Sequence, residues 1–273
     1  MSGSPLETAE VWDAVAVGYG EFAAAVMRPF AALALEFAAL TGESAVVDVG
    51  AGTGALTLPA AARAGRVCAV DISPEMLRLL EDAAAAAGLD NIVTDVADAR
   101  VLPYANRSFD AAFSMFGLMF FPDRYRALGE LYRVLRPGGT VVISNWAPIC
   151  ESPLLTLLYE AFREAVPEIG EPQQDFLSLE NPEVFQSELR RAGFHGVVIQ
   201  RHSIVTRFAD GVELWETMVA SSAALQVMRT LWGEEQWSER SGRVRDYLDR
   251  RYRPNQPLPA IALLGIGHKP QPA

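Results

Sequence analysis

The sequence predicts an α/β protein with a Rossmann-like, seven-stranded, mostly parallel sheet, helices on both faces of that sheet, and additional helical cap insertions. Three observations support this fold class. Short apolar runs alternate with helical segments in the first half of the chain at intervals of roughly 25–30 residues, as expected for crossover connections between parallel strands. A glycine-rich turn directly follows the first apolar run. The second half loses this alternation, which indicates extra helices inserted between the closing strands.

Five apolar runs in the first half are interpreted as strands. They are residues 45–49, 66–71, 91–94, 109–114 and 140–146. Helices are expected between them at residues 55–64, 73–87 and 123–135. Ser73 is a typical helix N-cap, because proline follows it at the first helical position and glutamate lies in the first turn. Residues 136–139, Arg-Pro-Gly-Gly, are expected to form a turn before the fifth strand.

A long helical stretch precedes the first strand, from residue 6 to 40, with interruptions expected near Gly18 and Gly20. Within it, residues 22–40 are apolar enough to suggest a membrane span, but they include Arg28 and Glu36, and a secretory signal would begin with basic residues. We interpret the segment as a buried helix, kinked at Pro29, and expect no membrane insertion.

The second half is expected to add helices at residues 153–167, 182–192, 211–229 and 240–253, irregular structure at 168–181, and strands at 196–208 and 258–268. The corresponding division of the chain has four parts. They are N-terminal helices covering a cofactor site (1–44), a ligand-binding Rossmann-like core (45–149), helical cap insertions that bind substrate (150–181 and 209–257), and a helix with the closing strands (182–208 and 258–273).

Composition limits the kinds of partner. The chain of 273 residues carries 23 basic and 34 acidic residues, a net charge of −11, so a nucleic-acid partner is not expected, whereas a small cationic ligand would suit it. Cys68 and Cys150 are the two cysteines, which predicts no disulfide framework and indicates a reducing, cytoplasmic location. The three histidines show no metal-ligand spacing, so no metal site is predicted. A homo-oligomer is left open.

The glycine-rich turn at residues 50–54 is compatible with two alternative kinds of ligand. Its Gly-x-Gly-x-x-Ala pattern satisfies the dinucleotide-binding fingerprint, which would indicate a nicotinamide-dependent oxidoreductase. Asp48 argues against this assignment, because a carboxylate at the ligand end of the strand would repel a pyrophosphate. The same carboxylate would favour a ligand that carries an ammonium and a sulfonium group.

Further motifs follow this loop in a characteristic order. They lie at residues 46–57, 69–77, 98–103, 108–110 and 135–139. With them the chain resembles the class I S-adenosylmethionine-dependent methyltransferases, and within that family the small-molecule branch that includes the ubiquinone/menaquinone-type enzymes. The resemblance covers residues 45–146, and residues 150–273 carry no motif of this kind. It implies S-adenosyl-L-methionine as cofactor.

The resemblance also implies particular contacts to that cofactor. Asp71 would accept hydrogen bonds from both ribose hydroxyls, and Asp98, favoured over Asp95, would accept from the adenine amino group. The Ala99 amide would meet a ring nitrogen of the adenine. The full set of predicted cofactor-binding residues is Tyr19, Asp48, Gly50, Ala51, Gly52, Gly54, Asp71, Ile72, Met76, Asp98, Ala99 and Ser114.

The methyl acceptor is expected to be small and largely apolar. Seven apolar residues, 115–121, follow the fourth strand and would begin beside the transferable methyl group. Trp146, Trp215, Trp232 and Trp237 could line an acceptor pocket or pack in the core. No general base is identified and the catalytic residues stay unassigned; the candidates for a base are His195, His202, Glu160, Glu213 and Glu216.

The sequence therefore predicts an enzyme that transfers a methyl group to O, N or C of a natural product or quinone-like metabolite. An alternative keeps the fold and the cofactor but uses them for a non-methylating cyclisation or rearrangement. The nicotinamide oxidoreductase is the remote alternative.

Overall fold

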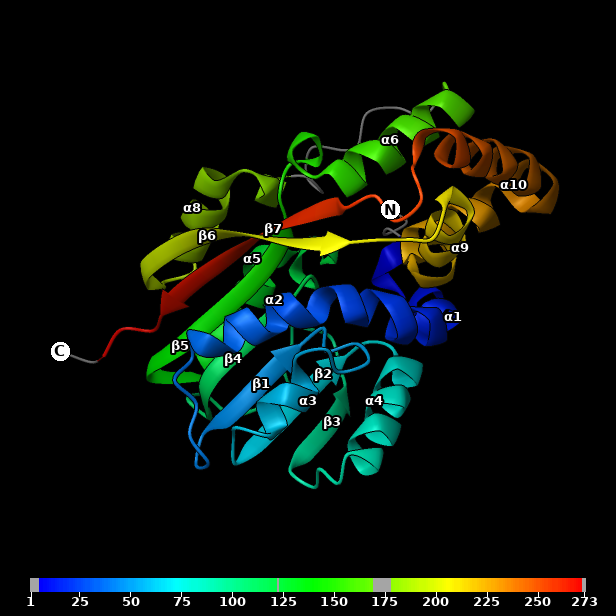
Figure 1. Cartoon of the computed structure of the whole chain (residues 1–273). Coiled ribbons are helices and arrows are strands. Elements are labelled where there is room, and N and C mark those ends of the chain that lie inside the picture. The colour runs from blue at the N-terminus through cyan, green and yellow to red at the C-terminus, as the bar shows by residue number, and fades with distance from the viewer. Residues whose placement is uncertain (1–4, 122, 169–177, 272–273) are drawn as a thin grey trace.

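Seven strands form one sheet in the order β3-β2-β1-β4-β5-β7-β6 in the computed structural model, which describes residues 5–121, 123–168 and 178–271 (Figure 1). The strands are β1 (Ala45–Val49), β2 (Arg66–Asp71), β3 (Ile92–Val96), β4 (Phe109–Met115), β5 (Leu135–Trp146), β6 (His195–Thr206) and β7 (Leu258–His268). Strands β1 to β5 pair in parallel, and β7 lies antiparallel between β5 and β6. The predicted fold class is confirmed.

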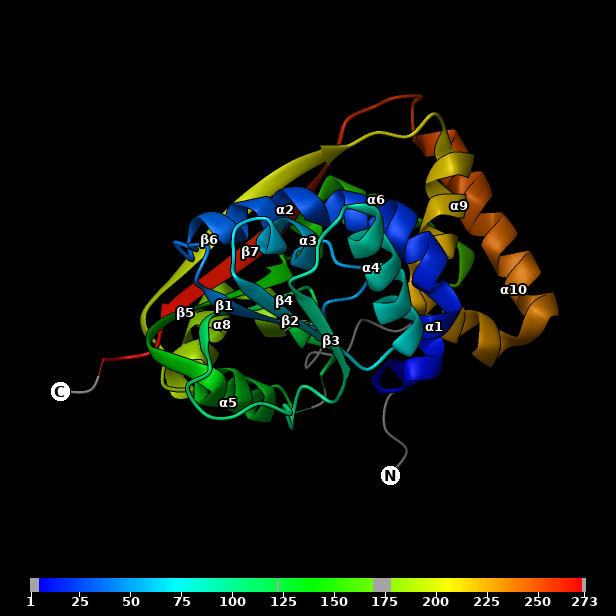
Figure 2. The same ribbon diagram turned by 90° about the horizontal axis from the view of Figure 1, so that it is seen from below.

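Helices cover both faces of this sheet. Those of the first half are α1 (Ala9–Gly18), α2 (Ala24–Glu36), α3 (Thr57–Ala61), α4 (Pro74–Ala86) and α5 (Arg124–Val134). Those of the second half are α6 (Pro153–Ala165), α8 (Pro182–Arg191), α9 (Gly211–Ser221) and α10 (Ala223–Arg251). Figure 2 shows α2 and α3 on one face of the sheet and α5 and α8 on the other.

The core consists of two apolar layers, one on each face of the sheet. Val47 and Ala112 of the central strands face the layer that contains Leu131 of α5 and Phe185 of α8. Their neighbours Val46 and Phe113 point to the opposite layer, which contains residues of α2 and α3. This alternation is the period of a β-strand, and burial on both faces explains why the strands read as continuous apolar runs.

The fifth strand is longer than predicted. Residues 136–139 were expected to form a turn, but β5 begins at Leu135, and the irregularity in its pairing with β4 lies between Phe109 and Ala111. Gly138 N–H donates to the Lys269 carbonyl at 2.8 Å, and Lys269 N–H donates to the Gly139 carbonyl at 2.9 Å. The chain beyond β7 therefore supplies pairing for these residues, and local sequence contains no signal of that pairing.

The N-terminal helices are fixed at two points. Ser73 Oγ and the Glu75 N–H, at the start of α4, donate to Asp13 Oδ1 of α1 at 2.5 and 3.2 Å. At the other end of α1, Gly18 lies so close to α9 that a Cβ there would be 2.2 Å from the Ala220 carbonyl oxygen. The predicted interruption near Gly18 and Gly20 is a π-helical segment, Tyr19–Ala23. In the described part of the chain, no helix has the length and apolar character needed to cross a membrane.

Helices α6, α9 and α10 pack together beyond the ends of the central strands (Figure 1), and we call them the helical cap. The predicted helix at 211–229 is wrong, since α9 ends at Ser221 and Ser222 caps a new helix by accepting from Leu225 N–H. The predicted gap before residue 240 is instead a kink in α10 at Gly233, whose φ is 74°. Two tryptophans, Trp215 and Trp237, stack with ring centroids 6.2 Å apart.

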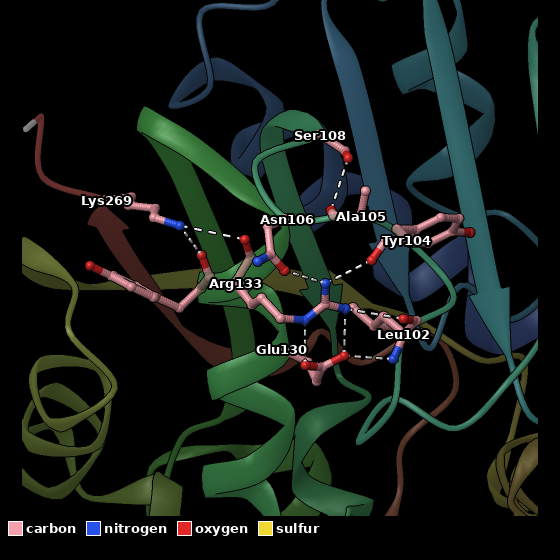
Figure 3. Close-up of polar contacts among 9 residues, drawn as sticks. Leu102, Tyr104, Ala105, Asn106, Ser108, Glu130, Arg133 and Lys269 are labelled. Carbon is pink, nitrogen blue, oxygen red and sulfur yellow. Dashed lines mark hydrogen bonds and ion pairs between the residues drawn. The ribbon is translucent and has the colours of Figure 1, made fainter.

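The loop between β3 and β4 is held from beneath by Arg133 of α5 (Figure 3). Its guanidinium donates to the Tyr104 and Leu102 carbonyls at 2.7 and 3.1 Å and to both carboxylate oxygens of Glu130. Glu130 in turn accepts from the Leu102 N–H at 2.8 Å. At the end of the same helix, Lys269 Nζ donates to the Leu135 and Tyr132 carbonyls at 2.9 and 2.6 Å. These bonds fix a loop that has no regular structure of its own.

Replacing Arg133 by methionine should lower the free energy of unfolding by about 1–3 kcal/mol, because it leaves loop carbonyls and Glu130 without their charged donor. Urea denaturation measures the change. The control is Arg243→Met, which removes an exposed pair with Glu239 within α10 and should cost less than about 0.5 kcal/mol. Equal losses in the two variants would contradict this role for Arg133.

Candidate functional site

The carboxyl ends of β1, β2 and β4 and the loop after β3 surround a cavity, which we call the loop cavity. Ligands of open parallel sheets bind at this edge. Its lining consists of Leu6, Glu7, Trp12, Tyr19, Val49, Gly50, Gly52, Val70, Asp71, Ile72, Met76, Ala97, Asp98, Ala99, Arg100, Met115, Phe116, Gly117, Phe120 and Phe121.

The glycine loop forms the floor of the loop cavity. The N–H groups of Gly50 and Ala51 donate to the Val70 carbonyl at 2.8 and 3.0 Å, so the loop is anchored to the end of β2. Gly52 has a left-handed φ of 54°, and a Cβ there would lie 3.4 Å from the ring of Tyr19. A side chain at this position would therefore be strained and would fill the floor on which a ligand can lie.

Asp71 ends β2 beside this loop. One carboxylate oxygen accepts from Gly52 N–H at 2.8 Å, and the other accepts from Ser73 N–H at 3.0 Å. Burial raises the pKa of Asp71, whereas the backbone hydrogen bonds from Ser73, Gly52 and Ile72 oppose that shift. Since a carboxylate has about four acceptor positions, Asp71 retains acceptor capacity for a ligand hydroxyl.

Asp98 also lines the cavity, but it already has a partner. Arg100 Nη2 and Nε donate to the Asp98 carboxylate at 2.7 to 3.0 Å, and the hydrogen bonds from Arg100 hold the pKa of Asp98 below its usual range. Any ligand amino group at Asp98 must share the carboxylate with this guanidinium. The sequence pattern favours Asp98 over Asp95 but contains no signal of the pairing with Arg100. Asp95 does not line the cavity and accepts from the Tyr104 hydroxyl at 2.7 Å.

Asp48 differs most from its predicted role. It is only 1% exposed, does not line the loop cavity, and accepts from the Thr57 hydroxyl at 2.6 Å beneath the glycine loop. Its other oxygen, Oδ1, is buried with no hydrogen-bond partner in the described structure. Burial raises the pKa of Asp48 to about 7. The predicted site places the carboxylates of Asp48, Asp71 and Asp98 around one ligand. In the structure only Asp71 and Asp98 line the cavity, because the loop backbone separates Asp48 from it.

The remaining predicted cofactor residues divide into two groups. Eight of the predicted residues line the loop cavity: Tyr19, Gly50, Gly52, Asp71, Ile72, Met76, Asp98 and Ala99. Ala51, Gly54 and Ser114 do not. A Cβ at Gly54 would lie 2.3 Å from the Leu80 side chain, so this glycine serves the contact between the loop and α4. Ser114 Oγ is buried beneath Gly117 and lacks a hydrogen-bond partner among the described residues.

A second cavity, the cap cavity, adjoins the first. Trp12, Tyr19, Phe116 and Phe120 line both cavities. Its other lining residues come from the N-terminal helices, the end of β5 and the helical cap: Phe22, Val26, Met27, Trp146, Leu154, Leu155, Leu158, Phe162, Trp215, Met218, Ser221, Ser222, Ala223, Ala224 and Leu225. These lining residues include no charged side chain.

Phe116 marks the junction of the two cavities. It has a left-handed φ of 57°, which is rare for a residue with a bulky side chain and which collects at functional sites. The conformation is held by a hydrogen bond from Phe116 N–H to Ser144 Oγ at 2.9 Å and by ring contacts with Trp146 and Phe30. The predicted apolar segment 115–121 thus does reach both cavities.

Several residues of the site were missed in the sequence. Trp12 and Tyr19 are seven residues apart, a spacing that places them on one helix face, and this signal could have added Trp12. Glu7 and Arg100 carried no recognisable pattern. Of the four tryptophans considered, Trp146 and Trp215 line the cap cavity, whereas Trp232 and Trp237 pack within the helical cap.

The candidate bases do not reach either cavity. His195, Glu213 and Glu216 are exposed, His202 contacts Gln200, and Glu160 accepts from the Tyr247 hydroxyl. Within the described ranges, no cluster of three or more His, Cys, Asp or Glu side chains could hold a metal ion. Tyr19 is the titratable group among the residues that line the cap cavity. Its pKa is raised, mainly by burial and then by the charges of Asp71 and Asp48. Its hydroxyl therefore stays protonated at neutral pH.

Comparison with known proteins identifies the central part of the chain. Residues 47–143 match the model of a methyltransferase domain. An uncharacterised protein of Mycobacterium tuberculosis is 38% identical over 133 residues, which are 49% of this chain and 47% of that protein. The demethylmenaquinone methyltransferase of Thermus thermophilus is 36% identical over 127 residues, which are 46% of this chain and 57% of that enzyme. Residues 47–143 are therefore a methyltransferase domain, in agreement with the family that the sequence motifs resemble.

The similarity to these curated relatives spans about half of their length. A solved structure with similar fold is that of the [4+2]-cyclase SpnF, with a TM-score of 0.58 and 24% identity over 90% of this chain and 81% of that one. The sheet order, with its antiparallel β7, also differs from the all-parallel order of the nicotinamide-binding fold. The glycine loop lies within the residues that match the methyltransferase domain.

S-adenosylmethionine is the cofactor of this family, and the loop cavity fits it. The carboxylate of Asp71, with its remaining acceptor capacity, would hold the ribose hydroxyls. Ile72, Met76 and Ala99 would provide apolar and backbone contacts for the base, and the bare backbone at Gly50 and Gly52 leaves room for the amino acid end.

Replacing Asp71 by asparagine should weaken binding of S-adenosylhomocysteine at least about tenfold, because each charge-assisted hydrogen bond to a hydroxyl contributes about 1.5–3 kcal/mol. Isothermal titration measures the affinity. Asp95→Asn is the matched control, since Asp95 pairs in register with Val70 on the neighbouring strand but lies outside the cavity, and it should change the affinity less than about twofold. Asp71→Asn binding like the wild type would contradict this assignment.

Asp48 should make stability depend on pH. Its pKa of about 7 in the folded protein exceeds the ordinary value of about 3.9 in the unfolded chain, so its stabilising contribution is complete below about pH 4 and is lost as the pH rises to about 7. The free energy of unfolding of the wild type, minus that of Asp48→Asn, should fall across this window by at most about 4 kcal/mol. Urea denaturation at several pH values tests it, and a constant difference would contradict the assignment.

Proposed function

We propose that the protein is a methyltransferase that transfers the methyl group of S-adenosylmethionine to O, N or C of a small, largely apolar metabolite, a natural product or quinone-like compound. The observation that carries this proposal is the shared wall of the two cavities. The loop cavity has the polar groups that suit the cofactor, and the cap cavity opens beside it through Trp12, Tyr19, Phe116 and Phe120. A nucleophile in the cap cavity could therefore reach the methyl group of the cofactor at the boundary that these four residues border.

The physical character of the cap cavity supports an apolar acceptor. Aromatic and aliphatic side chains such as Phe116, Trp146 and Leu158 form its surface, and burying apolar area there contributes about 25 cal/mol per Å². The apolar lining also offers water few hydrogen-bond partners near the reacting atoms, and the aromatic side chains limit the orientations that an acceptor can take. The chain's contribution to the reaction is thus mainly shape and desolvation.

We place this activity in the cytoplasm, because Cys68 and Cys150 are both free thiols. The proposed partner is the small-molecule acceptor, and a nucleic acid is not proposed, since the chain has a net charge of −11.

A non-methylating cyclisation of an apolar substrate is the second candidate. Two observations favour it: the cap cavity provides no ionised side chain for proton removal, and the neighbour named as a [4+2]-cyclase has a similar fold. In that case the cofactor would act only as a bound element, and the product would be an isomer of the substrate.

The experiment incubates the protein with S-adenosylmethionine carrying a labelled methyl group and a fraction of lipophilic metabolites, and analyses the products by mass spectrometry. We expect a labelled product and an equal amount of S-adenosylhomocysteine. An isomerised product without S-adenosylhomocysteine would favour the cyclase. Absence of S-adenosylhomocysteine binding in a titration would contradict both candidates.

Leu158→Arg provides the matched control. Leu158 lines only the cap cavity, so a buried cation there should abolish the labelled product while the affinity for S-adenosylhomocysteine changes less than about twofold. Loss of cofactor affinity in this variant would contradict the separation of the two cavities.

A further inference from the structure

We propose that the cap cavity selects a lipophilic molecule with a hydrogen-bond-accepting oxygen, a carbonyl or an oxyanion, at its cofactor end, and that the Tyr19 hydroxyl is the donor that positions this oxygen. The inference rests on the proposed function and adds to it the chemistry of the acceptor. It stands on the geometry of Tyr19 between the two cavities.

Tyr19 lies at the boundary and lines both cavities. Its Cε1, the ring carbon next to the one that carries the hydroxyl, faces the glycine loop, since a Cβ at Gly52 would be 3.4 Å from it. The hydroxyl itself donates to Met27 Sδ at 3.1 Å. Met27 lines the cap cavity and not the loop cavity. The hydroxyl end of the ring is therefore at the junction of the two cavities, and its hydrogen bond goes to a residue of the cap cavity.

The present partner of this hydroxyl is a weak one. A thioether sulfur is a poor hydrogen-bond acceptor, so the exchange of Met27 for a ligand oxygen would gain a stronger bond. The backbone around Tyr19 is also unusual, because Tyr19–Ala23 is a π-helical segment, and such segments occur frequently at functional sites. The Tyr19 hydroxyl thus has a weak hydrogen-bond partner and lies on a rare backbone conformation. Both features are expected of a side chain that exchanges Met27 for a ligand.

The other polar groups of the cap cavity have protein partners. Trp12 Nε1 donates to the Leu6 carbonyl at 2.9 Å, and Trp215 Nε1 donates to Ser241 Oγ at 2.8 Å. Ser221 donates to the Thr217 carbonyl within α9, and Ser222 caps α10. These groups stabilise the helical cap itself. Tyr19 differs from these groups, because its hydroxyl lies at the boundary of the two cavities and donates to a weak acceptor. Replacing that acceptor by a ligand oxygen would cost little free energy.

The Tyr19 hydroxyl acts as a hydrogen-bond donor, and this determines which class of ligand it favours. The Tyr19 hydroxyl is a protonated donor, since burial and the nearby carboxylates Asp71 and Asp48 raise its pKa. The described lining of the cap cavity has no carboxylate to pair with an ammonium group. Burying an unpaired cation is far more costly than burying a hydrogen-bonded oxygen. Oxygen-bearing ligands are therefore favoured over amines of the same shape.

The test compares three naphthalene probes of nearly the same shape: 2-acetylnaphthalene, its alkene isostere 2-isopropenylnaphthalene, and the cationic 1-(2-naphthyl)ethylamine. Equilibrium dialysis gives the dissociation constant of each, with and without saturating S-adenosylhomocysteine. The wild type should bind the ketone about fivefold to tenfold more tightly than the alkene, which corresponds to one net buried hydrogen bond. The amine should bind at least about tenfold more weakly than the alkene.

Two variants isolate the hydroxyl. Tyr19→Phe should bind the ketone only as tightly as the alkene, with the alkene affinity unchanged within about twofold. Met27→Leu removes the resting partner of the hydroxyl and should preserve or increase the preference for the ketone. The carbonyl stretch of the bound ketone, measured by infrared spectroscopy, should shift to lower wavenumber in the wild type and Met27→Leu but not in Tyr19→Phe. The infrared measurement on the wild type alone decides the contact if Tyr19→Phe does not fold.

A ketone preference that survives in Tyr19→Phe would overturn the inference, as would tightest binding of the amine or the absence of any probe binding. The proposed function is judged separately, since S-adenosylhomocysteine binding is measured without a probe. Cofactor binding without a Tyr19-dependent ketone preference would contradict only the role of Tyr19.

Discussion

The carboxylate of Asp71 is the interaction on which the site depends. It accepts the Gly52 N–H with one oxygen and the Ser73 N–H with the other, so one side chain holds both the glycine loop and the start of α4. Gly52 then keeps its left-handed conformation, and Ser73 caps α4 by accepting from Met76 N–H. A carboxylate at the end of a central strand thus builds the floor of the loop cavity before any ligand contacts it. Its remaining acceptor positions are what a ribose would use.

The N-terminal helices connect this floor to the cap cavity. Asp13 joins α1 to the same start of α4 through Ser73 and Glu75, and Gly18 allows α1 to approach α9 closely. Trp12 on α1 and Tyr19, the first residue after α1, are therefore fixed relative to both the glycine loop and the helical cap. The chemistry of the site follows from this arrangement, because a nucleophile and a cofactor must meet in a defined orientation between the residues that border both cavities.

Electrostatic differences between the two cavities have a simple origin. The loop cavity lies where strands end, and strand ends leave backbone N–H groups and carboxylates facing one edge of the sheet. The cap cavity lies among helices, whose backbone groups are already paired, so side chains alone determine its polarity. Phe116 lies at the junction of the loop cavity and the cap cavity. Its backbone has a left-handed conformation, and its N–H donates to Ser144.

The sequence by itself determined the sheet, the glycine loop and the positions of Asp71, Asp98, Ile72 and Met76, because these depend on apolar period, turn glycines and motifs contiguous along the chain. It also indicated an apolar acceptor through residues 115–121. Only the tertiary structure decided that Asp48 lies beneath the loop and that Arg100 forms an ion pair with Asp98. It also decided that Trp12, Tyr19 and Met27 line a cavity together with residues of the cap helices. Those facts depend on contacts between segments far apart in sequence, and local periodicity and spacing carry no information about such contacts.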